Sequence, residues 1–178
     1  AESSTTVAKE QARVALTGWG AELLANQNPD GNWGNGVYNP KWTCTTYSLL
    51  LLRQLGLPSR HPQALRGCEQ FFFRGLEKDG GINLFKSMKR SETCINGMIL
   101  TLTCYFGYPD PRIHSIAEFL IRDQMPDGGG NCERLSGATH ASFHTTISVI
   151  EGLSEYCLAY PQKWEMIQPA VDSAHEFL

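Results

Sequence analysis

The chain alternates between amphipathic stretches and stretches that are apolar round most of their circumference. In each amphipathic stretch the apolar residues are three or four positions apart, which is typical of a helix with one buried face. The stripes are Ala12, Leu16, Trp19 and Leu23; Leu65, Cys68 and Phe72; and Ile113, Ile116 and Leu120. The more apolar stretches contain Tyr47, Leu49, Leu50, Leu51, Leu52 and Leu55; and Ile95, Met98, Ile99, Leu100, Leu102, Tyr105 and Phe106. This pattern predicts an all-α protein with outer amphipathic helices and inner apolar helices.

Recurring Asp-Gly pairs and prolines divide these stretches into repeats. The aspartates Asp30, Asp79 and Asp127 each precede a glycine, at intervals of 49 and 48 residues. Prolines follow each apolar stretch at Pro58, Pro109 and Pro161, and Pro62, Pro111 and Pro169 are expected to begin the next helix, where a proline loses no needed hydrogen bond. The repeating unit is therefore an αα-hairpin with an Asp-Gly turn.

Stacked hairpins of this kind predict a partial α/α toroid of about three and a half hairpins, forming a single repeat domain over residues 1–178. The last residues, Glu176, Phe177 and Leu178, repeat the Glu-Phe-Leu sequence of the third outer helix. We therefore expect this chain to be a fragment of a longer toroid, and its open edge to favour self-association. The alternative is that the last helix caps the array.

Charge and hydropathy narrow the classes of partner. With 15 Lys and Arg against 18 Asp and Glu, and a net charge of −3, the chain lacks the basic surface expected of a nucleic-acid-binding protein. Its densest basic cluster is Lys86, Lys89 and Arg90, which predicts a solvated loop or, as an alternative, a site for an anionic substrate such as a diphosphate. The sequence contains neither a transmembrane stretch nor a signal peptide.

Six cysteines are present without a CxxC pair, and most of them lie in helical, apolar surroundings. Free cysteine packs as a small hydrophobic residue, so we expect reduced thiols in a cytoplasmic protein. The even number also leaves open disulfides in a secreted protein.

The first Asp-Gly turn lies in the sequence QNPDGNW, residues 27–33. This segment resembles the QW repeat of squalene-hopene cyclases and related terpenoid cyclases. The third unit retains Gln124 and its Asp-Gly pair but has Gly130 where the tryptophan would stand. The resemblance identifies the chain with the wider family of prenyltransferase and terpenoid-cyclase α/α toroids. Within the motif we expect Gln27 and Trp33 to have structural roles, with the glutamine bonding the turn backbone and the tryptophan packing across it.

The same resemblance provides two tests of catalytic activity. Cyclases that protonate a double bond have an Asp-x-Asp-Asp motif, and ionising terpene synthases have an aspartate-rich motif that binds metal and diphosphate. Neither motif occurs in this sequence. The remaining acids are turn residues or scattered surface carboxylates, and no pair is placed to raise a carboxyl pKa for general acid catalysis. Catalytic residues therefore remain unassigned.

A candidate metal site lies at the entry to the third inner helix. His140 and His144 are four residues apart, which places both imidazoles on one helical face, and Cys132 is a third candidate ligand for zinc. Inner helices of a toroid begin at the same rim, so Cys44 and Cys94 are expected near that end. The alternative is that the histidines and thiols are structural. Protein prenyltransferase β subunits resemble this region, but no Asp-x-Cys precedes it, so none of their zinc ligands carries over.

Three functions are consistent with these features. The first is a prenyltransferase- or cyclase-like protein that binds or processes an isoprenoid-type apolar substrate between aromatic side chains such as Tyr47, Tyr105, Phe106 and Phe143. The second is a non-catalytic binding or scaffold module. The third is a zinc-thiolate enzyme acting on a thiol substrate. We take isoprenoid processing as the leading hypothesis, on the analogy of fold.

Overall fold

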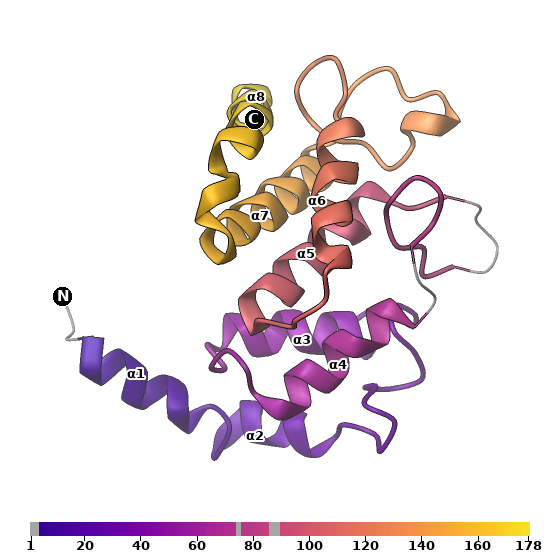
Figure 1. Cartoon of the computed structure of the whole chain (residues 1–178). Helices are drawn as coiled ribbons and strands as arrows, with labels where there is room; N and C mark the ends of the chain where they lie inside the picture. Colours follow the sequence, from indigo (N-terminus) through magenta and orange to yellow (C-terminus); the bar gives the residue numbers. More distant parts are fainter. Residues whose placement is uncertain (1–3, 74–75, 86–89) are drawn as a thin grey trace. The chain divides into compact units, whose positions relative to one another are not determined.

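The computed structural model describes residues 4–73, 76–85 and 90–178. Within these residues every element of regular secondary structure is a helix, and loops join the helices (Figure 1). The helices are α1 (Ser4–Arg13), α2 (Gly18–Ala25), α3 (Thr45–Gln54), α4 (Pro62–Phe72), α5 (Thr93–Phe106), α6 (Arg112–Arg122), α7 (Phe143–Ala159) and α8 (Trp164–Phe177). Two short 3₁₀ helices, η1 (Arg134–Ser136) and η2 (Pro161–Lys163), precede α7 and α8. The all-α prediction is confirmed. Lys86 and Lys89, from the predicted basic cluster, lie outside the described residues.

The chain divides into two compact units. The first unit comprises Ala1–Phe71 with Phe106–Tyr108, and the second comprises Phe72–Tyr105 with Pro109–Leu178. The toroid and the single repeat domain over 1–178 stay predictions. In the described residues no helix combines the length and apolar character that crossing a membrane requires.

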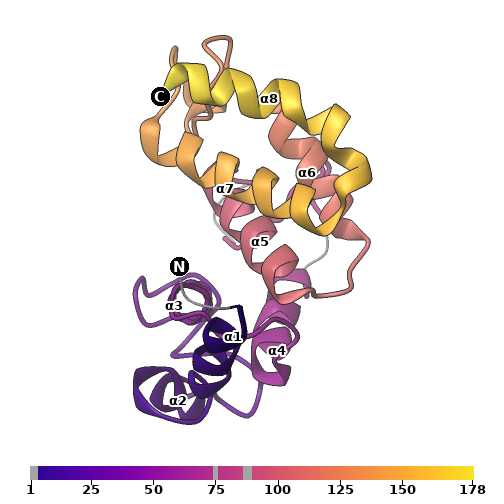
Figure 2. The same cartoon turned by 90° about the vertical axis from the view of Figure 1, so that its left-hand side faces the viewer.

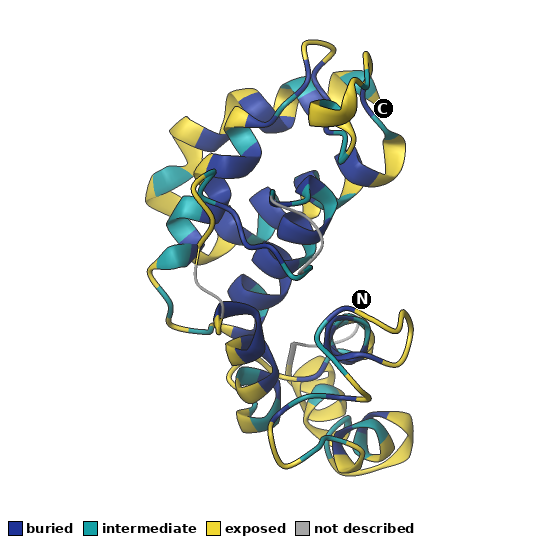
Figure 3. Ribbon diagram, turned by 90° about the vertical axis from the view of Figure 1, so that its right-hand side faces the viewer, coloured by how far each residue is buried: buried dark blue, intermediate teal, exposed yellow. Residues whose placement is uncertain are grey.

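Helix α5 is the core of the second unit, because residues on all its faces are buried, and most of its ribbon has the colour of buried residues (Figure 3). It approaches α7 at two glycines, because a Cβ at Gly97 would lie 2.4 Å from the Ser148 carbonyl and one at Gly152 would lie 2.6 Å from the Gly97 carbonyl. Glycine thus lets these two backbones touch. Helix α8 runs alongside α7 (Figure 2) and buries a stripe of Ile167, Ala170, Val171 and Ala174. The prediction of an inner apolar helix is confirmed for α5.

The three Asp-Gly turns share the same backbone hydrogen bonds. In each turn the amide two residues before the aspartate donates to the carbonyl two residues after it, at 2.8–2.9 Å. The pairs are Asn28 with Asn32, Glu77 with Gly81, and Met125 with Gly129. The glycine that follows each aspartate has a φ between 86° and 94°, a conformation that side chains disfavour. The predicted turns are therefore confirmed at all three positions.

The glutamines before two of these turns have the predicted structural role. Gln27 donates from its side-chain amide to the Gly31 carbonyl at 2.9 Å and to the Gln63 carbonyl at 2.8 Å. Trp33 is 2% exposed, donates from Nε1 to the Leu23 carbonyl at 2.7 Å, and packs beside Gly67. These contacts hold the first turn between α2 and α4.

The predicted first outer stripe is wrong. Leu16 is 73% exposed and Trp19 is 81% exposed, because the chain leaves the helix after Arg13 and re-enters it at Gly18. The cause is a tight bend in which Gly20 lies against the Val14 carbonyl, where a Cβ would approach to 2.3 Å. Helix α2 consequently buries Leu24 instead.

Two further predictions need correction. Pro169 lies inside α8 and does not begin it, because Pro161 already occupies the first turn of η2, from which α8 continues. Helix α3 is less buried than predicted, since Leu51 and Leu55 are exposed. By contrast, Pro62 is the first residue of α4 and Pro111 immediately precedes α6, as predicted.

Candidate functional site

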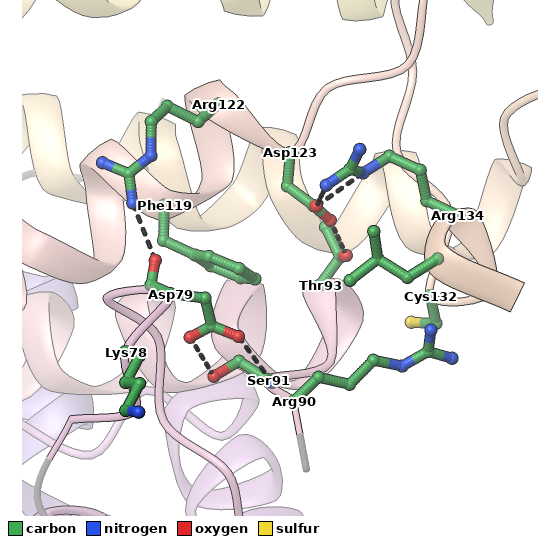
Figure 4. Close-up of a pocket in the computed structure, with 11 residues that line it drawn as sticks. Lys78, Asp79, Arg90, Ser91, Thr93, Phe119, Arg122, Asp123, Cys132 and Arg134 are labelled. Carbon is green, nitrogen blue, oxygen red and sulfur yellow. Dashed lines mark hydrogen bonds and ion pairs between the residues drawn. The ribbon is translucent and has the colours of Figure 1, made fainter. Parts of the chain in front are cut away.

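A cavity of about 350 Å³ lies in the second unit, where the start of α5, the end of α6 and the loops beside them meet (Figure 4). Its wall carries more positive than negative charge, because it contains four cationic side chains and two carboxylates. The lining residues are Lys78, Asp79, Arg90, Ser91, Thr93, Phe119, Arg122, Asp123, Cys132, Arg134 and Leu135. A cavity whose wall carries an excess of positive charge attracts an anion.

The first carboxylate, Asp79, belongs to the second Asp-Gly turn and is fully engaged there. Its Oδ1 accepts hydrogen bonds from the Gly81 amide at 3.0 Å and the Ser91 hydroxyl at 2.8 Å. Its Oδ2 accepts the Ser91 amide at 2.9 Å (Figure 4). Asp79 therefore fixes Ser91, and with it the backbone entering the cavity wall, against the turn.

The second carboxylate, Asp123, ties three elements together. It is buried directly after α6 and accepts a short hydrogen bond from the hydroxyl of Thr93, the first residue of α5. Its Oδ1 accepts from both Nε and Nη2 of Arg134 at 2.6 Å, at the start of η1. Charge-assisted hydrogen bonds of this kind are strong and fix the geometry of both partners. Its role is to hold Thr93 and Arg134 in place.

Among the described residues, no buried carboxylate pairs with the remaining three cations in this way. Arg122 donates to the Asp79 backbone carbonyl at 2.7 Å, and Arg90 donates to the Ser136 hydroxyl at 2.7 Å. Arg90 also lies 3.6 Å from a carboxylate oxygen of Glu133, whose side chain is largely exposed. Lys78 is exposed beside them. Arginine and lysine side chains arranged in this way are suited to phosphate oxygens, which accept several charge-assisted hydrogen bonds at once.

A pair of thiols lies at the edge of the same cavity. Cys132 is in the wall, and its Sγ accepts the amide of Cys94 in the first turn of α5 at 3.2 Å. Hydrogen bonds from the Cys94 thiol and, to a smaller extent, from the Cys94 amide lower the pKa of Cys132. The pKa of Cys94 is raised by its interaction with the Cys132 thiol and by burial. The cavity wall thus includes a thiol pair in which Cys132 is the sulfur more easily ionised.

The predicted zinc ligands lie in different surroundings. Cys132 contacts Cys94 and Thr145, whereas His140 is exposed before α7 with its Nδ1 3.3 Å from the Thr139 hydroxyl. His144 is the second residue of α7 and is also exposed. Among the residues that the structure describes, no group of three His, Cys, Asp or Glu side chains could hold a metal ion. The zinc site stays a prediction.

The shared rim expected for the inner helices stays a prediction; Cys94 at the start of α5 contacts Cys132 in the loop before η1. Cys44 in the first unit is buried at the start of α3, with its thiol donating to the Tyr38 carbonyl at 3.0 Å. Of the aromatic residues predicted to line a substrate site, Tyr47 packs against Trp42 in the first unit and Phe143 packs against Phe177 in the second.

Sequence reasoning found one cation of this cavity, Arg90, and missed its neighbours. Arg122 and Asp123 directly precede Gln124 of the third turn, and Lys78 directly precedes Asp79 of the second. Their common position beside the Asp-Gly turns was the available signal, because equivalent turns gather at one end of a helical hairpin array. Arg134 had no comparable signal, since its place depends on the loop that follows.

The chain resembles a curated protein along part of its length. It is 28% identical to drimenyl diphosphate synthase from Streptomyces showdoensis over 129 residues, which cover 71% of this chain and 24% of that protein. The chain thus spans about a quarter of the length of this relative, and the match supports a distant, terpenoid-cyclase-like relationship. No protein-family model matches the chain. No solved structure matches it.

Proposed function

We propose that the second unit binds an isoprenoid diphosphate, with the diphosphate in the cavity lined by Lys78, Arg90 and Arg122. The observation that carries the proposal is the charge of this cavity, in which four cationic side chains face two carboxylates that are already engaged in hydrogen bonds. The similarity to a synthase named for a diphosphate product supports it.

The diphosphate would be held by charge-assisted hydrogen bonds. The Arg122 and Arg90 guanidinium groups have N–H groups beyond those bonded to the Asp79 carbonyl and the Ser136 hydroxyl, because each guanidinium carries five N–H donors. Lys78 supplies a third positive charge from the exposed side. Arg134 stays bound to Asp123 and adds its field without leaving that ion pair.

The apolar part of the ligand would begin at Phe119 and Leu135, the two large apolar side chains in the cavity wall. At about 350 Å³ the cavity is near the lower end of the range for small-molecule sites. It therefore suits the headgroup and the first isoprene unit, and the rest of the chain would extend beyond it. In this proposal the αα-hairpins belong to a toroid of the terpenoid-cyclase type.

The proposal concerns binding, and it assigns no proton donor. Asp79 accepts hydrogen bonds from Gly81 and Ser91, and Asp123 accepts hydrogen bonds from Thr93 and Arg134. Both carboxylates therefore have structural partners in the cavity wall, and the chemistry of a cyclase would require groups other than these two.

The experiment that tests this function is a calorimetric titration of the reduced chain with farnesyl diphosphate, inorganic diphosphate and farnesol. We expect farnesyl diphosphate to bind most tightly, inorganic diphosphate to bind more weakly, and farnesol to bind weakly or not at all. The affinity for both diphosphates should fall as salt rises, because the contacts are between charges. Equal affinity for farnesol and farnesyl diphosphate, or no diphosphate binding, would contradict the proposal.

A further inference from the structure

Two of the six cysteines differ from the others in exposure and in their mutual position. Cys94 and Cys132 are partly exposed, whereas Cys44, Cys68, Cys104 and Cys157 are buried. Cys94 is in the first turn of α5, and Cys132 is in the loop between α6 and η1. The two are 38 residues apart in sequence, and the Cys94 amide donates a hydrogen bond to the Cys132 sulfur.

The distance between these residues suits a covalent bond between the two sulfurs. The Cys94 amide nitrogen lies 3.2 Å from the Cys132 sulfur, so the Cys94 Cα is at most about 4.7 Å from that sulfur. A Cα this close to the partner sulfur brings its own thiol within reach of that sulfur, and a disulfide forms when the two Cα atoms lie about 4.4–6.8 Å apart. Because Cys132 is in a loop and not in a helix, the loop backbone can adjust to reach this separation.

The surroundings of Cys132 favour its thiolate. Its sulfur accepts the Cys94 amide at a helix N-terminus, where the backbone N–H groups carry partial positive charge. Arg90 and Arg134 line the same cavity wall, each with a carboxylate beside it, Glu133 and Asp123 respectively. An opposing charge that acts on both thiols is Glu92, the residue directly before α5. Cys132 is therefore the nucleophilic member of the pair, and Cys94 is placed to react with it.

We infer that Cys94 and Cys132 form a redox-active dithiol that hydrogen peroxide converts into a disulfide. In the first step the Cys132 thiolate attacks one peroxide oxygen, the O–O bond breaks, and the released hydroxide takes up a proton to give water and a sulfenic acid. In the second step the Cys94 sulfur loses its proton and attacks the Cys132 sulfur, the S–S bond forms, and the S–O bond breaks to release a second water. Two thiols are oxidised and one peroxide is reduced.

The product would tie the first turn of α5 to the loop before η1, at the edge of the cavity. This inference depends on the thiol geometry and is independent of what the cavity binds. It also distinguishes these two cysteines from the buried four, for which we expect reduced side chains throughout the same treatment.

The test is peptide mapping of the reduced chain after exposure to one equivalent of hydrogen peroxide and alkylation of the remaining thiols. Trypsin places Cys132 in the peptide of residues 123–134 and Cys94 in the peptide of residues 91–112, which also contains Cys104. We expect a cross-linked pair of these peptides, with fragment ions that assign the bond to Cys94. Alkylated Cys132 after peroxide treatment, or a bond from Cys132 to any other cysteine, would overturn the inference.

Two variants make the assignment independent of fragment ions. In Cys94→Ser the reaction should stop at the Cys132 sulfenic acid, which dimedone labels, and in Cys104→Ala the cross-link should form as in the unmodified chain. Loss of the cross-link in Cys104→Ala with a retained helical circular dichroism spectrum would contradict the inference, as would a cross-linked species of twice the chain mass in a non-reducing gel.

Discussion

The side-chain amide of Gln124 donates a hydrogen bond to the backbone carbonyl of Ala170, 2.8 Å away, and so joins the end of α6 to α8. The same amide donates to the carbonyl of Gly128 in the Asp-Gly turn. In the first unit Gln27 makes the corresponding two bonds, to Gly31 and to Gln63 of α4. One side chain thus fastens an outer helix, its turn and the next outer helix.

Replacing Gln124 by alanine should lower the stability of the second unit. The variant leaves two backbone carbonyls without this donor, and a lost or unmet buried hydrogen bond costs about 1–3 kcal/mol. Urea unfolding followed by circular dichroism measures the change. The control is Gln168→Ala, an exposed residue on α8, which should change the free energy of unfolding by less than about 0.5 kcal/mol. Equal losses in the two variants would count against the role of Gln124.

Two glycines with positive φ, Gly128 in the third Asp-Gly turn and Gly137 after η1, allow the cost of backbone strain to be distinguished from the cost of a steric clash. Gly128 has φ +94° and a Cβ there would lie 2.4 Å from the Ser173 carbonyl, whereas Gly137 has φ +100° with no atom within 4 Å. Gly137→Ala should therefore cost only the strain of a left-handed residue, about 1–2 kcal/mol. Gly128→Ala should cost clearly more in thermal unfolding, because α8 must also move. Similar melting temperatures for the two variants would refute the contact.

The start of α6 should show a pH-dependent contribution from Asp110. The Arg112 side chain, 2.6 Å away, holds the pKa of the Asp110 carboxyl below its usual value, and the Arg112 amide adds to this effect. A lowered folded-state pKa contributes stability above the unfolded-state value near 4, which is lost as the pH falls through the folded-state pKa. Asp110→Asn keeps a side-chain oxygen that can accept the Arg112 amide but removes the negative charge. The variant should therefore lower the free energy of unfolding by up to about 1 kcal/mol at pH 7.

The measurement for this pair is urea unfolding of the unmodified chain and Asp110→Asn at pH 7 and at pH 3. The difference in the free energy of unfolding should shrink at the lower pH, because the carboxyl of the unfolded chain binds a proton there and unfolding becomes more favourable. A difference that stays constant between these pH values would show that the ion pair contributes nothing.

The helices and turns could be predicted from the sequence because their causes are local. Apolar residues spaced three and four apart predicted α6. The Asp-Gly pairs predicted three turns, and these turns share one pattern of hydrogen bonds. The first stripe failed because a single close approach, Gly20 to the Val14 carbonyl, overrode the spacing through Leu16 and Trp19. Such a bend depends on backbone contact that hydrophobic periodicity does not encode.

The candidate site was harder to predict because its members come from separate loops. Arg90 was noticed as part of a basic cluster, but its meeting with Arg122 depends on how the turn at Asp79 packs against α6. The predicted histidines share a helical spacing, yet both are exposed. The contact of Cys94 with Cys132 was not predicted, because it depends on how the loop between α6 and η1 folds back onto the start of α5.

The most direct test of the diphosphate site compares two arginines that make the same structural hydrogen bond. Arg122 and Arg66 each donate from Nη2 to the backbone carbonyl of the preceding turn at 2.7 Å, to Asp79 and to Pro29 respectively. Arg122 lines the basic cavity of the second unit, whereas Arg66 is in the first unit and is exposed. Replacing each by glutamine therefore removes an equivalent backbone contact, but only one change removes a cavity charge.

The measurement is the calorimetric affinity of farnesyl diphosphate for the unmodified chain, Arg122→Gln and Arg66→Gln at one salt concentration. We expect Arg122→Gln to weaken binding about tenfold or more, as the loss of a hydrogen bond between charged groups requires, and Arg66→Gln to leave the affinity within about twofold of the unmodified chain. An unchanged affinity in Arg122→Gln, or an equal loss in both variants, would contradict a diphosphate site in this cavity.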